Sequence, residues 1–474
     1  MKRGRVRRGL GLALLALVAV AVVMALIPLP ALSLRRAPSP IDGSDPALPW
    51  LQVRDGRIQD STGRTVLLRG FNVDALVLYP DEPPAGFDEE DARLIQRGGF
   101  NLVRLGIDWA QLEPVRGQID QGYLDRVSRT VAMLNAHGLY AILDMHFRLG
   151  WSPRYGASGA PAWATFPLPD VYLGKGRLSW GHGVSPAAVA AVTYFWLARD
   201  WQRDFATVWQ AVARRFSDVP GVAAYDVINE PDGLPIPPVL FEKYWMWPFY
   251  QRVMQAVLDV DPHHVLMAES ILFLNLDTVI RPLQGGNLVY GPHLYVGSLI
   301  PPFWTGDPAP QADRLNEFRR EADRLPAPLW VGELGFDLTR TQAAGYADAT
   351  LDLMDERVLG WSWWQWRQNR WWGIRDAGGA LANRDVLRHL ARPYLQAAPS
   401  GVRASRGNGI AGALTIEVAP GHGTGAAVVG WSALTLPAPH VLGACVRASH
   451  WDASRSQIVL DFQPGSGCTV RISA

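Results

Sequence analysis

The sequence has almost no excess of either charge: 45 Lys and Arg residues stand against 44 Asp and Glu residues, and the formal net charge is +1. A protein that binds nucleic acid needs a strongly basic surface, which a nearly neutral chain does not provide. The sequence also lacks a nucleotide-binding motif and a cluster of residues at metal-ligand spacing. We therefore expect no nucleic-acid partner, no cofactor and no metal.

Cysteine is scarce as well, since Cys445 and Cys468 are the only two in the chain. Two thiols without further ligands nearby do not complete the four-coordinate site that zinc prefers. In an exported protein, a disulfide between two strands is the simplest use of such a pair. We expect these two cysteines to form that bond.

The first 36 residues combine a basic start with an apolar run. Lys and Arg occupy five of positions 2–8, and the uncharged stretch 9–34 is rich in Ala, Leu and Val. This pattern directs export, and the run exceeds the about 20 residues that span a bilayer. We expect residues 1–36 to be a signal peptide or a membrane anchor, and the protein to be secreted or anchored outside the cytoplasm. A proline-rich linker follows at 37–49.

The chain has 474 residues, of which 48% are hydrophobic, so it can bury one large core and a smaller one. It holds 20 Trp. Their flat apolar rings suit the faces of sugars, although core packing is the more common use of any single Trp.

Residues 50–398 alternate between short apolar runs and segments with helical periodicity, such as 89–97 and 121–137. The apolar runs predict eight strands, at 65–71, 101–106, 139–144, 222–228, 264–268, 287–290, 328–333 and 358–364. Polar residues gather at the same end of these strands. The pattern predicts an α/β fold, a (β/α)8 TIM barrel whose carboxyl-end face collects residues that are far apart in the sequence.

The sequence pattern changes near the C-terminus. Short alternating runs at 414–418, 426–431, 456–462 and 469–472 are separated by Gly, Pro and Ser. This pattern predicts a small C-terminal β-sandwich domain, 399–474, which contains both cysteines.

Two of the predicted barrel strands end in a carboxylate that is suited to catalysis. Asn229-Glu230-Pro231 closes the strand at 222–228, and Glu333 closes the strand at 328–333. Two carboxyl groups that face each other across a sugar are what glycoside hydrolysis requires, since one donates a proton and the other attacks. We expect this pair to mark the active site.

Other polar residues at strand ends are candidates for support. Arg104 would be costly to bury unpaired, so we expect it to hold the Glu333 carboxylate ionised. His146 and His293 follow strands on the same face, where they can bind the sugar or serve as core histidines. Glu269 is a rival catalytic carboxylate, but no Asn and Pro flank it, and orienting other groups suits it better.

The chain resembles glycoside hydrolase family 5 in the residues after its strands, namely Arg104, His146, Asn229-Glu230-Pro231, His293-x-Tyr295, Glu333 and Trp363 or Trp364. A narrower resemblance, to endoglycoceramidases and their glucosylceramidase-like relatives, rests on 159–165, 249–251, 331–333 and Arg392-Pro393-Tyr394. It covers residue 66 to the end.

The resemblance implies that Glu230 is the acid/base, that Glu333 is the nucleophile and that Asn229 donates to the sugar 2-hydroxyl. It also implies that Arg104, His146, His293, Tyr295 and Trp363 or Trp364 form the substrate site. The relatives follow the histidine with Gln-Asp, whereas Phe147-Arg148 stand here. That difference changes the surroundings expected for the sugar.

Three aromatic stretches, 147–196, 244–249 and 299–304, follow predicted strands. Long barrel loops are commonly lids or binding walls, and these could hold an apolar aglycone at a rim formed by Trp245, Trp247, Phe303 and Trp304. Alternatively, the aromatics pack on one another or stack on a polysaccharide.

We therefore predict a retaining β-glycosidase that hydrolyses glycolipid and associates with a membrane through its N-terminus and aromatic loops. Two alternatives stay open. One is an endo-β-glucanase or mannanase that acts on soluble polysaccharide, and the other is a non-catalytic cell-surface protein that binds carbohydrate. The presence of both glutamates argues against the non-catalytic alternative.

Overall fold

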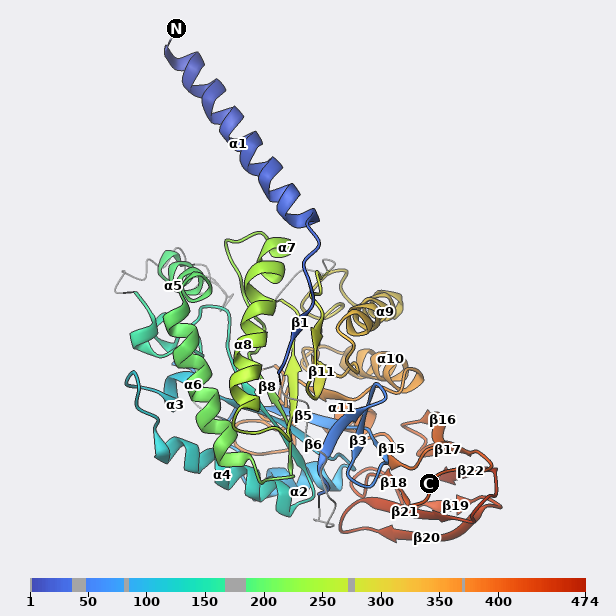
Figure 1. Ribbon diagram of the computed structural model, residues 1–474. Coiled ribbons are helices and arrows are strands. Elements are labelled where there is room, and N and C mark those ends of the chain that lie inside the picture. The colour runs from blue at the N-terminus through green and yellow to red at the C-terminus, as the bar shows by residue number, and fades with distance from the viewer. Residues whose placement is uncertain (1, 36–47, 81–84, 167–184, 272–277, 369–370) are drawn as a thin grey trace.

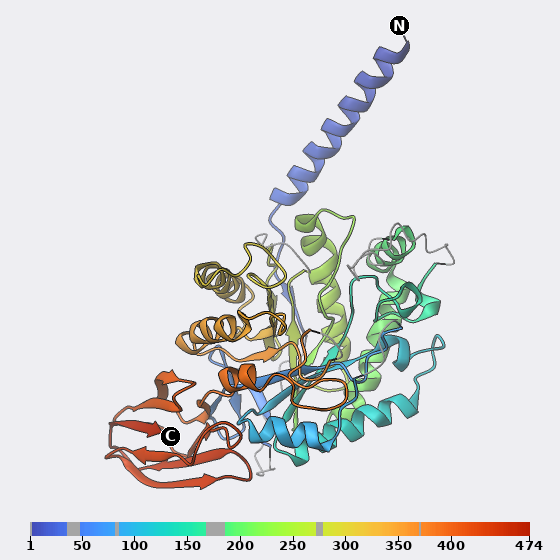
Figure 2. The same cartoon turned by 180° about the vertical axis from the view of Figure 1, so that it is seen from behind.

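The computed structural model describes residues 2–35, 48–80, 85–166, 185–271, 278–368 and 371–474. These residues form a barrel of parallel strands wrapped by helices and a smaller all-β unit made largely of the C-terminal residues. A long helix, α1 (Lys2–Leu26), projects away from the body (Figures 1 and 2).

The barrel sheet runs in the order β11-β9-β8-β7-β6-β5-β14-β13-β12. Strands β11 and β12 are two pieces of one strand: β11 pairs with β9 and β12 pairs with β13, so the ring closes at eight positions. The predicted (β/α)8 barrel is confirmed. Its strands are β5 (Arg69–Val73), β6 (Leu102–Ile107), β7 (Tyr140–Met145), β8 (Val222–Asp226), β9 (Val265–Ala268), β11 (Leu288–Tyr290), β12 (His293–Leu294), β13 (Val331–Leu334) and β14 (Trp361–Trp363).

Helices cover the outside of the barrel, which explains why its strands are apolar on both faces. At the start of α2, the Asp88 carboxylate accepts from the Asp91 N–H while the Asp91 carboxylate accepts from the Asp88 N–H. This capping box begins the helix at the predicted residue. The outer helices are α2 (Glu89–Arg97), α4 (Gln121–Ala136), α6 (Arg199–Phe216), α8 (Trp247–Leu258), α9 (Ala309–Arg324), α10 (Ala343–Glu356) and α11 (Arg384–Leu390).

Further helices lie in the connections that follow the strands. They are α3 (Trp109–Leu112), α5 (Pro186–Leu197), α7 (Pro238–Phe241) and the π-helix η4 (Glu242–Met246). The aromatic stretch 244–249, predicted as a loop, is therefore helical: it lies in η4 and the first turn of α8.

A seven-stranded antiparallel sheet lies against the amino end of the barrel and draws strands from both ends of the chain, in the order β2-β3-β4-β15-β18-β21-β20. The predicted strand 65–71 is wrong as a single element. Thr65 and Val66 form β4 in this sheet, and only Arg69–Val73 enters the barrel. The other strands are β2 (Leu51–Arg54), β3 (Arg57–Asp60), β15 (Tyr394–Ala398), β18 (Ala427–Gly430), β20 (Val446–Asp452) and β21 (Gln457–Phe462).

A four-stranded sheet completes a β-sandwich with the C-terminal part of the seven-stranded sheet. Ile416 and Val470 from one sheet meet Val429 and Ile458 from the other in a common apolar core. The predicted C-terminal sandwich is therefore present, and Cys445 and Cys468 are joined in it by a disulfide. The strands of this sheet are β16 (Val402–Asn408), β17 (Ala413–Val418), β22 (Cys468–Ser473) and β19 (His440–Leu442).

The amino end of the barrel is filled by apolar side chains. Leu51 and Val66 from the N-terminal strands pack against Leu68, Ile142 and Met267 of the barrel, all of them buried. Burial of this kind is the main favourable contribution to folding. We call this group the amino-end plug.

The chain between α1 and the barrel is bound along the outside of the molecule. Strand β1 (Leu32–Ser33) pairs in parallel with β10 (Leu283–Gln284). Among the described residues, no helix combines the length and the apolar character needed to cross a membrane. Most of the predicted linker 37–49, namely residues 37–47, lies outside the described residues.

Candidate active site

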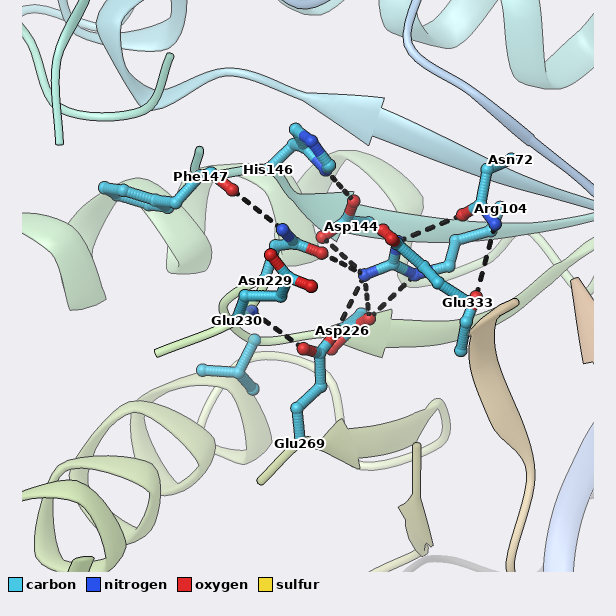
Figure 3. A network of polar contacts seen from close by, with 12 residues as sticks. Asn72, Arg104, Asp144, His146, Phe147, Asp226, Asn229, Glu230, Glu269 and Glu333 are labelled. Atoms are coloured by element: carbon cyan, nitrogen blue, oxygen red, sulfur yellow. Dashed lines mark hydrogen bonds and ion pairs between the residues drawn. The ribbon is translucent and has the colours of Figure 1, made fainter. Parts of the chain in front are cut away.

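A network of charged side chains lies at the carboxyl-end face of the barrel, centred on Arg104 of β6 (Figure 3). The Arg104 guanidinium is fully buried and contacts four carboxylates, those of Asp144 at 3.1 Å, Asp226 at 2.7 Å, and Glu269 and Glu333 at 2.8 Å each. It also donates to the side-chain oxygens of Asn72 and Asn229. The predicted contact between Arg104 and Glu333 is confirmed.

The network keeps Arg104 charged. Burial alone would lower the pKa of Arg104, but the surrounding carboxylates outweigh burial and raise it well above its usual value. Four carboxylates around one guanidinium leave an excess of negative charge. Burial, and then the charge of Glu269, raise the pKa of Asp226 well above its usual value, which favours the protonated form of Asp226.

Glu333 lies on β13 and is 4% exposed. Its Oε1 accepts from Arg104 Nη1 at 2.8 Å, and its Oε2 accepts from the Tyr295 hydroxyl at 2.8 Å. Burial raises the pKa of Glu333, and the charges of His293 and Arg104 only partly offset this rise. Two donors thus fix the two oxygens of the carboxylate.

Glu230 follows β8 and is the more open of the two candidate catalytic carboxylates, with a side chain 23% exposed. Its φ of 45° is unusual for a residue other than glycine. The backbone N–H of Glu230 donates to Glu269 Oε2 at 2.7 Å, which holds this conformation in place. One ligand atom each from Glu230, His293 and Glu333 lie within 4.8 Å of one another.

His293 joins the two sides of the site. Its Nδ1 lies 2.9 Å from Glu230 Oε1, and its Nε2 lies 3.1 Å from Glu269 Oε1. Burial would lower the pKa of His293, but the charges of Glu269 and Glu333 raise it well above its usual value. The pKa of Glu269 falls to about 2: burial opposes this fall, and His293 and Arg104 cause it. These contacts fit Glu269 as a group that orients others.

The opposite wall of the site is aromatic. His146 Nδ1 lies 2.7 Å from Asp144 Oδ2, and the His146 ring stacks on Trp364 with centroids 5.4 Å apart and planes at 12°. Trp363 is fully buried and faces Tyr346 of α10 instead. Of the two tryptophans that sequence analysis left open, only Trp364 lies at the site.

Asn229 is held by its neighbours. Its Nδ2 donates to the Phe147 carbonyl at 2.7 Å, and its Oδ1 accepts from Arg104 Nη2 at 2.9 Å. An amide nitrogen carries two hydrogens, so one N–H of Asn229 remains available for a substrate hydroxyl.

The structure adds Asp74, Gln365 and Tyr79, which sequence analysis did not single out. With its amide nitrogen turned toward Asp74, Gln365 donates to the Asp74 carboxylate at 2.8 Å. The Tyr79 ring lies edge-on to His146, with Arg148 5.5 Å from its centroid. These residues lie in loops, where no periodic pattern reveals them. Asp144 and Asp226 had a visible signal, since each is a lone carboxylate in an apolar strand.

The predicted aromatic rim is only partly present. Trp247 is fully buried, its indole N–H donates to the Val279 carbonyl at 2.8 Å, and it packs on Tyr250 one turn along α8. The prediction that Trp247 lines the rim is therefore wrong, because helical periodicity turns it into the core. Trp245 is partly buried against the same core, Phe303 is 58% exposed, and Trp304 packs on Tyr346.

The long stretch 147–196 supplies both core and wall. Trp151 is buried between Trp109 and Phe195, and Tyr155 is buried as well, so these aromatics pack within the protein. Tyr172 and Trp180 lie outside the described residues. Beside Glu230, a hollow is lined mainly by apolar side chains, including Leu149, Val192, Trp196 and Ile228.

Within the described part of the chain, two groups of side chains have the spacing to hold a metal ion. One comprises Glu230, His293 and Glu333, which already bond to one another. The other comprises Asp144, Asp226 and Glu269, and each of these carboxylates contacts Arg104. The guanidinium thus already supplies positive charge to the second group.

Comparisons with known proteins agree with this geometry. Residues 59–370 match the family model described as cellulase, glycosyl hydrolase family 5. Endoglycoceramidase I of Rhodococcus hoagii (strain 103S) is 30% identical over 393 residues, which are 74% of each chain. Among solved structures, an endogalactoceramidase has a TM-score of 0.75 at 26% identity and covers 90% of this chain and 100% of its own. A ganglioside GM3 complex of endo-glycoceramidase II from Rhodococcus sp. has a TM-score of 0.72 at 25% identity and covers 88% of this chain and 99% of its own.

Proposed function

The chain belongs to glycoside hydrolase family 5, and from this premise we propose that it is a retaining β-glycosidase that cleaves the glycosidic bond of a glycolipid. The observation that carries the substrate class is the likeness to the endoglycoceramidases, which extends over the barrel and the sandwich. The spacing of Glu230 and Glu333 supports the retaining mechanism.

In the first step, Glu333 attacks the anomeric carbon while Glu230 gives its proton to the departing glycosidic oxygen. The sugar becomes an ester of Glu333, and the aglycone leaves as an alcohol. Retaining enzymes place their two carboxyl groups about 5 Å apart, whereas inverting enzymes leave about 6.5 Å or more for a water molecule. The 4.8 Å limit on the ligand atoms of Glu230 and Glu333 supports direct attack.

In the second step, Glu230 takes a proton from water, and the resulting hydroxide attacks the anomeric carbon and releases Glu333. The product keeps the β configuration, because two inversions have occurred. Arg104 and the Tyr295 hydroxyl donate to Glu333 throughout and stabilise it as the leaving carboxylate. His293 Nδ1 lies 2.9 Å from Glu230 Oε1 and holds this carboxyl group in position.

The sugar that is cleaved would lie against Trp364, whose ring is partly exposed and stacks on His146. The free N–H of Asn229 can donate to its 2-hydroxyl, a bond that strengthens in the transition state. The carboxylate of Asp74, which is partly exposed and held by the buried Gln365, offers a further partner for hydroxyls.

The aglycone would leave on the side of Glu230, because the acid must reach the glycosidic oxygen. On that side lies a hollow with a largely apolar wall, which includes Leu149, Val192, Trp196 and Ile228, and with Arg148 and Asp232 as further lining residues. An apolar wall suits the first carbons of a lipid aglycone better than a second, heavily hydroxylated sugar. This contrast favours a glycolipid.

The family model, described as cellulase, favours one alternative substrate class, a soluble β-glucan. A panel of short-chain glycosylceramides in detergent, cellulose and mannan distinguishes the two, with released sugars identified by mass spectrometry. We expect intact glycan from the glycosylceramides, with the β anomer formed first in NMR spectra. Faster cleavage of cellulose or mannan than of every glycolipid would reject the glycolipid assignment, and an initial α anomer would reject the retaining mechanism.

We also propose that the protein works outside the cytoplasm. The basic and apolar N-terminal sequence and the joined Cys445 and Cys468 support this location, since structural disulfides persist in oxidising compartments. Mass spectrometry of the native protein, without reduction, should show the two cysteine peptides linked. Two free thiols in protein recovered from outside the cytoplasm would count against the pairing.

A further inference from the structure

We propose that the carboxyl-end face of the barrel docks on a lipid bilayer, with the apolar sides of α1 buried in lipid. Docking would bring the active site to glycolipid in the membrane, and this benefit rests on the proposed function. Docking itself can be measured on vesicles that contain no glycolipid, so the two proposals can fail separately.

The first observation is the apolar surface of α1, which stands clear of the body (Figures 1 and 2). In its described part, Leu14 is 64% exposed, Leu17 is 67% exposed and Leu26 is 76% exposed. No charged residue occurs between Leu14 and Leu26. A helix that is apolar on every side requires apolar surroundings, which the rest of the described chain does not supply.

The second observation is that α1 is fixed at its base. The Lys243 ammonium, itself 7% exposed, donates to the carbonyl of Ala25 at 2.8 Å and to that of Met24 at 3.1 Å. The Tyr244 hydroxyl donates to the same Met24 carbonyl at 2.7 Å. These carbonyls end a helix and have no partner within it, so the lysine and tyrosine act as its cap.

The chain after α1 is held as well. Arg281 Nε donates to the Pro30 carbonyl at 3.2 Å, and Gln251 Nε2 donates to the Ser33 carbonyl at 3.0 Å. The pairing of β1 with β10 adds backbone hydrogen bonds, in which the N–H groups of Leu32 and Leu34 donate to carbonyls of the β10 segment. The helix therefore has a defined attachment to the body rather than a flexible one.

The attachment determines which face of the molecule is turned toward α1. Lys243 and Tyr244 belong to η4, which lies in the connection from β8 to α8. Glu230 begins that same connection. The helix thus leaves the body at the end of the barrel that carries the active site, and the β-sandwich lies at the far end (Figure 1).

The third observation is an apolar rim on this face. Six large hydrophobic side chains that are 38% to 58% exposed follow β5, β8, β12 and β14, namely Leu78, Leu234, Val239, Leu299, Phe303 and Trp371. Exposed apolar groups that gather on one face mark an interaction surface. Because the loops that carry them follow barrel strands at the same end as Glu230 and Glu333, a bilayer that meets this rim would also come close to the catalytic pair.

Charge agrees with lipid as the partner. The basic residues among positions 2–8 come directly before the apolar part of α1 and suit anionic headgroups. A second copy of the chain offers the same basic segment and would repel it. Self-association through α1 is therefore the competing outcome that an experiment must separate.

Hydrogen exchange of the full chain, with and without phosphatidylcholine and phosphatidylglycerol vesicles, tests the proposal. We expect the chain to sediment with the vesicles and exchange to slow severalfold at 233–246 and 296–304, with no change at 440–452 in the sandwich. Absence of sedimentation, or protection on the sandwich instead of the rim, would overturn it. The same protection in a vesicle-free oligomer would assign the face to a second copy.

A matched pair of variants tests the rim. Leu234→Ser with Val239→Ser should weaken vesicle binding about tenfold and leave hydrolysis of a soluble aryl β-glycoside unchanged. Leu442→Ser removes a side chain that is 71% exposed on the sandwich and should leave both unchanged. Equal vesicle binding by the rim variant and Leu442→Ser would overturn the proposal.

Discussion

At its amino end the barrel is filled with Leu51, Leu68, Ile142 and Met267, whereas at its carboxyl end the same strands bury Arg104 among four carboxylates. Apolar burial stabilises a fold, while each buried charge costs free energy that its partners only partly return. The difference between the two ends indicates that the two ends of the barrel strands have different roles. One end maintains the fold, and the other holds charges that are useful to a reaction.

The strongest test of this division is Glu333→Gln. We expect it to lower kcat by about 10⁴-fold or more, because the attacking group is removed. The free energy of unfolding should not fall, since burial already disfavours the ionised carboxylate that Gln replaces. An aryl β-glycoside assay and a thermal melt measure the two quantities.

Glu230→Ala is the companion variant for the other catalytic carboxylate. It should regain part of its activity with azide, or with a leaving group that needs no proton. Full activity in either variant would contradict the assigned roles.

Glu269→Gln tests whether the buried charge of Glu269 supports catalysis through its neighbours. We expect a loss of about 10²-fold in kcat/KM. Gln can still accept from the Glu230 N–H, but it loses the charge that raises the pKa of His293. The pKa of His293 should therefore fall, and the alkaline limb of the pH–rate profile should move to lower pH. A loss of rate with an unmoved profile would indicate a merely structural role for Glu269.

Leu68→Ala tests the opposite end of the barrel. Truncation of this buried side chain should lower the free energy of unfolding by about 2 to 4 kcal/mol, because it leaves a cavity in the amino-end plug. Below the melting temperature, kcat/KM should stay unchanged. Leu197→Ala, at a side chain that is 58% exposed, is the control and should affect neither quantity. Loss of activity in folded Leu68→Ala would show that the ends are coupled.

Glu242→Gln concerns a buried carboxylate that, unlike those around Arg104, forms no ion pair within the described part of the chain. Burial raises its pKa to about 8, so the folded state keeps a proton that the unfolded state releases above about pH 4.5. The wild type should therefore lose stability as pH rises from 4.5 to 8, and Gln should remove this loss. We expect the stability gain from Gln to grow by about 2 kcal/mol between pH 6 and pH 8. Parallel denaturation curves at the two pH values would contradict this.

Much of the barrel and of the site could be predicted from the sequence. The apolar runs place Glu230 and Glu333 at or near strand ends, because buried parallel strands are near-continuous runs of hydrophobic residues and a carboxylate that follows such a run is easily recognised. The sequence could not show that 65–71 belongs to two strands, because its apolar residues are buried in two different places. Val66 faces the amino-end plug, and Phe71 lies inside the barrel wall.

The rest of the site depends on tertiary contacts. Asp74 and Gln365 meet only because the loops after β5 and β14 are neighbours in the closed ring. Nothing in the sequence near either residue shows that contact. By contrast, the burial of Trp247 was predictable, since Trp247, Tyr250 and Met254 repeat at helical spacing and all face the core.

The seven-stranded sheet joins the beginning and the end of the chain, and this has a consequence for biosynthesis. Strands β2 to β4 are made early, yet β4 pairs with β15, which emerges from the ribosome only after the whole barrel has been translated. The seven-stranded sheet at the amino end of the barrel therefore remains incomplete for most of synthesis. A chain stalled before Tyr394 would expose the edge of β4, and such edges recruit other strands. Premature termination should thus yield aggregates rather than a smaller working enzyme.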